Sequence, residues 1–189
     1  MRISRYQQDD IEQFAFYFDQ HVVNLESAAT AYCSATGDAA AAIDAAQLGQ
    51  ITCMLDLLPP DGEHLASLEL IWQWLCDNPH QVESLKTDCQ DIQLLVPIAR
   101  PNKLLLLAGN YSAHVQEGGG DPIEREETFP YVFMKPASTT LTDPGTAIQI
   151  ASCSPDNFDW ELELGVVIGR RGKHIAAADA LNYVAGYTV

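Results

Sequence analysis

The spacing of hydrophobic residues changes near position 92 of this 189-residue chain. Before that point, residues 64–77 (HLASLELIWQWLCD) place apolar side chains at intervals of three and four, and Asn78-Pro79 follows them. This spacing predicts an amphipathic helix that ends at the proline. After residue 92, short apolar runs alternate with turn residues, which is typical of strands. The first half is therefore predicted to contain the longest helix and the second half most of the strands.

Two further elements are predicted in the first half. Residues 11–23 mix aromatic and β-branched residues around Asp19-Gln20, which favours a hairpin. The Ala-rich stretch of residues 25–48 is interrupted at Gly37-Asp38, so we expect two short helices there. In the second half, strands are expected at residues 94–96, 103–108, 131–134, 147–150 and 160–168. A short helix is expected at residues 176–184, with Gly186 near its C-terminal cap.

The chain is strongly acidic, with 26 acidic and 10 basic residues and a formal charge of −16. Phosphate backbones and anionic membrane surfaces are bound by clustered Lys and Arg, so we expect neither nucleic acid nor a membrane as partner. Residues 1–94 carry a net charge of −12 and residues 95–189 only −4. A small anionic substrate is therefore better tolerated by the second half.

The N-terminus and the cysteines bear on the compartment. No window approaches the roughly 18 apolar residues of a transmembrane helix, and the first residues lack the apolar core of a signal peptide. The five cysteines are scattered and never form a C-x-x-C pair, which favours reduced, mostly buried thiols. These features predict a cytoplasmic protein.

Glu161 and Glu163 lie one residue apart in the clearest predicted strand, WELELGVVI. Because strand side chains alternate between faces, both carboxylates are expected on one side. Adjacent carboxylates repel each other, and a hard divalent cation such as Mg²⁺ or Mn²⁺ relieves that repulsion. The alternative is an edge strand whose glutamates are simply solvated.

Three further polar residues are candidates for chemistry. His114 and Glu117 are three residues apart, so on a helix they share a face and the carboxylate can orient the imidazole to accept a proton. Gly118-Gly119-Gly120 follows and could let this segment move as a lid. Lys135, at a strand end before Pro136, could hold a substrate carboxylate or form a salt bridge. Both the pair and the lysine could equally be surface residues.

Taken in order, these segments resemble the fumarylacetoacetate hydrolase family. The resemblance rests on residues 95–101 (LVPIARP), 109–111 (GNY) with His114 and Glu117, 133–136 (FMKP), 161–169 (ELELGVVIG), 179–181 (DAL) and 183–189 (YVAGYTV). It implies an α+β protein in which residues 1–91 form a small N-terminal α/β accessory region. Residues 92–189 then form the first part of a catalytic domain built on a mixed β roll, incomplete in this chain.

The resemblance also implies roles for the candidate residues. Glu161 and Glu163 correspond to ligands of Mg²⁺, Mn²⁺ or Ca²⁺, His114 and Glu117 to a water-activating pair on a lid, and Lys135 to a residue near the site. A third acidic ligand is expected downstream of Val189, so this chain alone is expected to lack a complete metal shell and to be inactive without it. A homodimer is a further expectation from the family.

The implied reaction is hydrolysis of a C–C bond in an acylpyruvate or another 1,3-dicarbonyl 2-oxo acid. A metal-polarised carbonyl and a metal-stabilised enolate leaving group would make that bond breakable. A decarboxylase or isomerase would use the same enolate without attack by water, so the motifs leave these reactions open. A non-catalytic, truncated interaction module is the alternative of another class.

Overall fold

The computed structural model describes residues 1–37, 45–117, 119, 129 and 131–189. Two compact units are present: Met1–Pro97 together with Asp143–Val189, and Ile98–Thr142. Helices and strands occur together, as an α+β protein requires, and the described strand pairs are antiparallel. The proposed boundary at residue 92 and the mixed β roll stay predictions.

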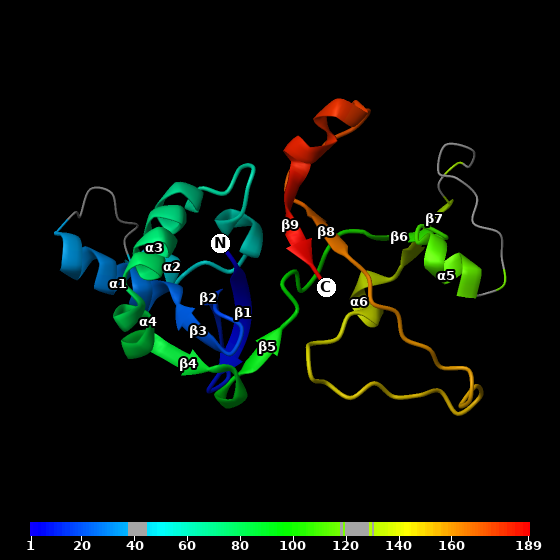
Figure 1. Cartoon of the computed structure of the whole chain (residues 1–189), viewed down its shortest axis with the longest axis horizontal. Helices are drawn as coiled ribbons and strands as arrows, with labels where there is room; N and C mark the ends of the chain where they lie inside the picture. Colours follow the sequence, from blue (N-terminus) through cyan, green and yellow to red (C-terminus); the bar gives the residue numbers. More distant parts are fainter. Residues whose placement is uncertain (38–44, 118, 120–128, 130) are drawn as a thin grey trace. The chain divides into compact units, whose positions relative to one another are not determined.

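The first unit contains a five-stranded antiparallel sheet in the order β4-β3-β2-β1-β5 (Figure 1). Its strands are β1 (Ile3–Gln8), β2 (Ile11–Tyr17), β3 (His21–Asn24), β4 (Lys86–Asp88) and β5 (Gln93–Leu95). The hairpin predicted at residues 11–23 is confirmed as β2 and β3, with Asp19 in the turn at φ 62°. β1 was not predicted because its sequence, ISRYQQ, is largely polar.

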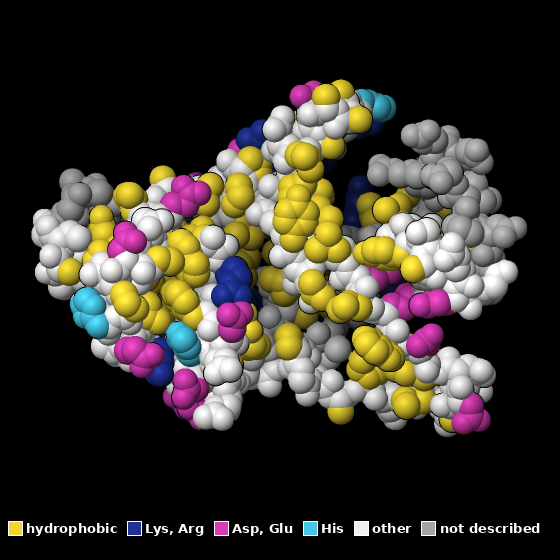
Figure 2. All heavy atoms as spheres, in the orientation of Figure 1, with side chains coloured by type: hydrophobic (Ala, Val, Ile, Leu, Met, Phe, Trp, Pro, Cys, Tyr) yellow, Lys and Arg dark blue, Asp and Glu magenta, His cyan; other side chains and the backbone are white. Residues whose placement is uncertain are grey.

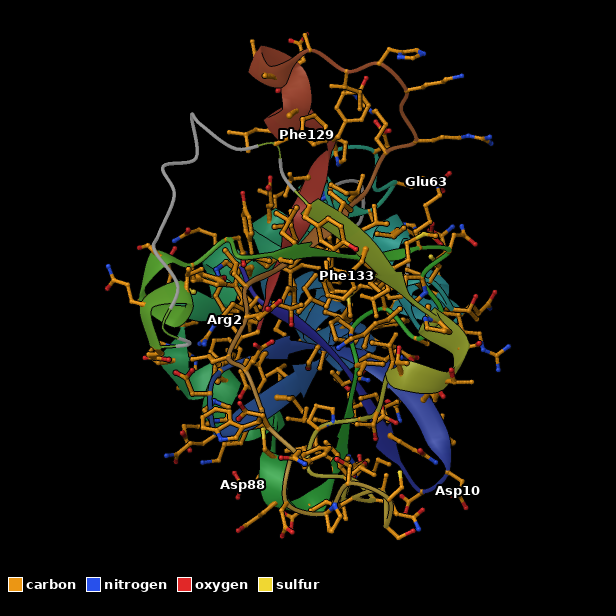
Figure 3. The ribbon with its side chains drawn as sticks, turned by 90° about the vertical axis from the view of Figure 1, so that its right-hand side faces the viewer. Arg2, Asp10, Glu63, Asp88, Phe129 and Phe133 are labelled. Carbon is orange, nitrogen blue, oxygen red and sulfur yellow. The ribbon has the colours of Figure 1, made fainter. Side chains whose placement is uncertain are left out.

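β1 forms a strand because β2 lies beside it along its whole length. The register runs from Ile3 opposite Phe16 to Gln8 opposite Ile11, so backbone pairing compensates for weak local propensity. Asp9 and Asp10 connect the strands with φ values of 49° and 63°. Two positive φ values characterise the type I′ turn that suits a two-residue hairpin. Asp10 lies at the tip of this hairpin (Figure 3).

Helices follow β3 and cover one face of the sheet. They are α1 (Leu25–Thr36), α2 (Ala45–Leu48), α3 (Leu65–Asp77) and α4 (Pro79–Leu85), with a 3-10 turn η1 (Met54–Leu57) between α2 and α3 and η2 (Cys89–Asp91) after β4. The two Ala-rich helices are confirmed. Gly37 ends α1 in the left-handed conformation at φ 69°, whereas Asp38 lies outside the described residues. Pro79 ends the predicted helix and also begins α4, where its missing N–H costs nothing.

The core occupies both faces of the sheet. Phe16 of β2 is fully buried on the helical side, with its ring centroid 5.6 Å from that of Trp72 on α3. On the other face, Tyr6, Ala15 and Val22 form a buried cluster. Partly buried side chains pack against it, namely Tyr17, Cys89, Ile92 and Leu94. The segment after β4 therefore closes the face that the helices leave uncovered.

A polar network links this second face to the start of α1. Asn24 Nδ2 donates to Gln13 Oε1 at 2.6 Å and to Tyr6 Oη at 3.1 Å, and Tyr6 donates to Gln13 at 3.0 Å. Asn24 Oδ1 accepts from the Ser27 N–H at 3.0 Å and so caps α1. Burial raises the pKa of Tyr6, against a smaller lowering by the hydrogen bond from Asn24. One side chain thus joins three strands to a helix.

We expect Asn24→Ala to lower the free energy of unfolding by about 1–3 kcal/mol, because it removes the helix cap and the two hydrogen bonds that Asn24 donates to Tyr6 and Gln13. Asn24→Asp keeps the oxygen that caps α1 but cannot donate a hydrogen bond. Because it retains the capping interaction, it should lower the free energy of unfolding less than Asn24→Ala does. Urea denaturation followed by circular dichroism measures both. Wild-type stability in Asn24→Ala would contradict this role.

In its described residues, the second unit contains one hairpin and two short helices. β6 (Leu104–Ala108) pairs with β7 (Tyr131–Lys135), from Leu104 opposite Lys135 to Ala108 opposite Tyr131. α5 (Ser112–Glu117) follows β6, and α6 (Ala137–Thr140) follows β7. Figure 3 labels Phe133 on β7, a residue whose exposed fraction is 37%. The strands predicted at residues 103–108 and 131–134 are confirmed.

β8 (Gly165–Ile168) pairs with β9 (Val184–Thr188), and four predictions for residues 147–189 are corrected. The strand predicted at residues 160–168 begins at Gly165, because β9 pairs with it from Gly165 onward. Residues 147–150 lie outside the three sheets, since β-prone residues form a strand only beside a neighbouring strand. Gly186 lies within β9 rather than at a helix cap. The helix predicted at residues 176–184 is a 3-10 helix, η3 (Ala177–Tyr183).

The cysteines also depart from expectation. All five are free thiols, as predicted. They are not mostly buried, since Cys53, Cys76 and Cys153 are exposed and the other two are half-buried. Because the helices are short and the sheet has few strands, little volume is available to enclose side chains outside the central sheet.

Candidate functional site

Glu161 and Glu163 lie immediately before β8, in a segment without regular secondary structure. Glu161 is exposed and Glu163 is half-buried. The strand alternation that was expected to place both carboxylates on one side therefore begins two residues after Glu163. The hairpin that follows supplies the anchor for this segment.

The β8–β9 hairpin is closely built at both ends of β8. A Cβ on Gly165 would lie 2.9 Å from Thr188 Cγ2, so glycine is required where β8 begins opposite β9. The Gly169 N–H donates to the Tyr183 carbonyl at 2.8 Å just beyond the other end. A register irregularity lies between Val167 and Ile168. These contacts fix the two ends of β8, and Glu163 lies two residues before its first residue.

The two glutamates match the donor chemistry of a hard divalent cation. Carboxylate oxygens are preferred ligands of Mg²⁺, which commonly uses one or two carboxylates and keeps several waters. Among the residues that the structure describes, no group of three His, Cys, Asp or Glu side chains could hold a metal ion. The pair therefore fits part of a coordination shell, with the other positions left to water, substrate or further ligands.

His114 and Glu117 belong to the second unit, where α5 contains both positions. The helical spacing expected for this pair is thus present in the backbone. Gly109 precedes α5 with φ 66°, a conformation that favours glycine, and the Val115 N–H donates to the Tyr111 carbonyl at 3.1 Å. Glu117 is exposed. Of the predicted glycine lid, Gly118 and Gly120 lie outside the described residues.

Lys135 is the last residue of β7, directly before Pro136, as the sequence predicted for a strand end. It is exposed and lies opposite Leu104 in the register. Glu161 and Glu163 thus lie in the first unit, and His114, Glu117 and Lys135 lie in the second.

One contact beyond the far end of β8 from the glutamates was missed by the sequence reasoning. Arg170, just beyond β8, forms a two-point ion pair with Asp61, 109 residues earlier in the chain. Asp61 belongs to the sequence Pro59-Pro60-Asp61-Gly62 and Arg170 to the sequence Gly169-Arg170-Arg171-Gly172, both of which are rich in turn-forming residues. Nothing in either turn indicates the other, because such pairing is a property of the tertiary fold.

Comparison with known proteins agrees with the expected family. Residues 103–189, which include all five candidate residues, match the family model described as Fumarylacetoacetate (FAA) hydrolase C-terminal. Over 99 residues the chain is 39% identical to "Fumarylacetoacetate hydrolase domain-containing protein 2" of Pongo abelii. Through this segment, the chain is similar to the fumarylacetoacetate hydrolase family.

Individual relatives carry more specific names. The chain is 39% identical over 99 residues to "Oxaloacetate tautomerase FAHD2A, mitochondrial" of Homo sapiens, covering 52% of this chain and 30% of that protein. It is 38% identical over 109 residues to an uncharacterized protein of Staphylococcus aureus, covering 58% of this chain and 34% of that one. The chain spans about a third of the length of the curated relatives it matches.

Within the described part of the chain, no helix is long and apolar enough to cross a bilayer. The human relative is named as mitochondrial. The cytoplasmic location expected from the sequence stays a prediction.

Proposed function

We propose that the protein is a divalent-metal-dependent enzyme that acts on a small 2-oxo dicarboxylate or 1,3-dicarbonyl acid, with keto–enol tautomerisation as its first candidate reaction. The observation that carries this proposal is the 39% identity over 99 residues with a protein named oxaloacetate tautomerase. The family match over residues 103–189 supports an enzyme of this family and leaves the reaction open. Tautomerisation therefore moves ahead of the C–C hydrolysis expected from the sequence.

Glu161 and Glu163 are the residues we assign to the metal, which would be Mg²⁺, Mn²⁺ or Ca²⁺. Their separation by one residue just before β8 lets a single short segment supply two hard oxygen donors. When bound, such an ion supplies Lewis-acid polarisation of the substrate carbonyl. The carboxylates themselves hold the ion and neutralise its charge.

His114 and Glu117 are the pair we assign to proton transfer. Their positions three residues apart on α5 allow the carboxylate to orient the imidazole. In tautomerisation, the base removes a proton from the carbon between the two carbonyl groups, and a proton returns to the carbonyl oxygen, so no atoms are gained or lost. Lys135 is assigned to a substrate carboxylate, for which an ammonium group is a suitable counter-charge.

C–C hydrolysis of an acylpyruvate is the second candidate reaction. The same pair would take a proton from water, and the hydroxide would add to the distal carbonyl before the C–C bond breaks. The released carbon then accepts a proton, which balances the reaction. A helix that carries both a histidine and a glutamate at this spacing favours keeping this alternative. Decarboxylation, homodimer formation and the absence of nucleic acid and membrane partners remain predictions.

The test uses protein expressed from its complete natural coding sequence and stripped of metal by chelation. Enol-to-keto conversion of oxaloacetate, its decarboxylation and acylpyruvate cleavage are each followed by ultraviolet absorbance with and without Mg²⁺ or Mn²⁺. We expect metal-dependent acceleration of the tautomerisation by at least about 100-fold over the uncatalysed rate. Uncatalysed rates in all three assays would overturn the proposal.

A non-catalytic interaction module makes the opposite prediction. Calorimetric titration with Mg²⁺ and Mn²⁺, run beside light scattering, would then show no metal binding and obligate association with a partner chain. Metal binding accompanied by turnover excludes this alternative.

A further inference from the structure

The loop of residues 58–62 contacts the turn that follows β8. Arg170 Nε donates to Asp61 Oδ2 at 2.7 Å, and Arg170 Nη2 donates to Asp61 Oδ1. The guanidinium also lies over the ring of Tyr183, 5.8 Å from its centroid. Two parallel hydrogen bonds to one carboxylate restrain direction as well as distance. The contact therefore specifies the orientation of Arg170 on the loop.

Backbone contacts reinforce this ion pair. A Cβ on Gly169 would lie 2.6 Å from the Pro59 carbonyl oxygen and 2.8 Å from Ala185 Cβ. Ala185 of β9 is buried, with an exposed fraction of 5%. The end of β8 therefore fits against the loop too closely for any side chain at Gly169.

The loop itself is held by the core of the N-terminal region. The Gly62 N–H donates to the Leu58 carbonyl at 2.9 Å, and a Cβ on Gly62 would lie 2.5 Å from the same oxygen. Leu57, just before the loop, is fully buried. Asp61 is thus presented from a closely packed turn rather than from a long connection.

The ion pair contributes little to global stability, because its side chains are 42% and 56% exposed. The hydrogen bond from Arg170 nevertheless holds the pKa of Asp61 below its ordinary value. A contact of this kind affects orientation more than folding.

We propose that Asp61 and Arg170 are positioning residues, which hold the β8–β9 hairpin on the N-terminal region and so direct the segment that carries Glu161 and Glu163. This inference rests on the proposed metal role of those glutamates. Arg170 follows β8 by two residues, and Glu163 precedes it by two. β8 is therefore the one element between Arg170 and the proposed ligands in the chain order.

Figure 2 shows hydrophobic side chains on the surface along this hairpin. Val166, Ile168 and Tyr187 have exposed fractions of 50%, 57% and 61%. Side chains that are half exposed give the hairpin few packing contacts of its own. Its orientation then depends on the contacts at Gly169 and Arg170, which is why a solvent-exposed ion pair can matter here.

The test compares Asp61→Asn, Arg170→Gln and the charge-exchanged double variant D61R/R170D in the complete protein. Hydrogen exchange measured by mass spectrometry reports on the amides of residues 163–169, and calorimetry reports Mn²⁺ affinity. We expect each single variant to exchange at least about 5-fold faster in this segment and to bind Mn²⁺ about 3- to 10-fold more weakly, with an unchanged melting temperature. The double variant should recover part of both losses.

Arg2→Gln is the matched control, because the Arg2–Asp19 ion pair is also exposed but joins the residue before β1 to the β2–β3 turn. It should change neither measurement. If Arg170→Gln leaves hydrogen exchange or Mn²⁺ affinity at the wild-type level, the positioning role is overturned, while metal loss in Glu161→Gln still supports the proposed function. If wild-type protein binds no Mn²⁺, the proposed function and this inference both fail.

Discussion

Glu161→Gln is expected to lower kcat/KM for the metal-dependent reaction by at least about 100-fold, because it removes one of two negative charges assigned to the metal. Glutamine keeps the length and shape of the side chain, so packing around this exposed position should not change. Glu163→Gln should give a loss of the same order. The measurement is the rate of oxaloacetate tautomerisation across a Mg²⁺ concentration series.

The dependence of the tautomerisation rate on Mg²⁺ concentration distinguishes a metal ligand from a residue that does not bind the metal. Loss of a ligand should shift half-saturation to higher Mg²⁺, and excess metal should restore part of the rate. Glu69→Gln is the control, since Glu69 is an exposed glutamate on α3 in the N-terminal region. A rate in Glu161→Gln equal to that of Glu69→Gln would remove Glu161 from the site.

Phe16→Ala is expected to lower the free energy of unfolding by about 3–5 kcal/mol. Phe16 is fully buried, packs against Trp72 of α3 and lies at the centre of the sheet, so its loss leaves a cavity between the two layers. This is a large fraction of the stability of a small domain, which is of order 5–15 kcal/mol. Guanidinium denaturation followed by tryptophan fluorescence provides the measurement.

Ile11→Ala is the matched control in the same strand, because Ile11 is 60% exposed at the start of β2. A surface substitution of this kind should change stability by no more than about 0.5 kcal/mol. Equal losses in the two variants would show that the sheet, rather than the buried face, determines the stability of this unit.

Local patterns predicted the elements whose signals lie within a few residues. The helix at α3 follows from its apolar spacing and from Asn78-Pro79, and the β2–β3 hairpin from its turn residues. β1 has no such signal, since its polar residues become a strand through pairing with β2. The same principle explains why β8 is shorter than its hydrophobic run, because the ladder extends only where β9 lies beside it.

For the candidate site too, some features could be predicted from the sequence and others appeared only in the tertiary structure. Residue types and their order identified the glutamate pair, the His114–Glu117 spacing and the family resemblance, since these depend on chemistry carried by short segments. The helix that contains His114 and Glu117 has the expected local form. Sequence alone could not place Asp61 beside Arg170, because no local interaction relates two turns 109 residues apart.

The sequence by itself therefore determined the family resemblance, the candidate chemical groups and the helices and hairpin with strong local patterns. Tertiary structure alone decided which strands pair, where β8 begins and which loop holds it. The physical reason is that backbone hydrogen bonds in a sheet, and ion pairs between distant turns, need a partner that another part of the chain must supply.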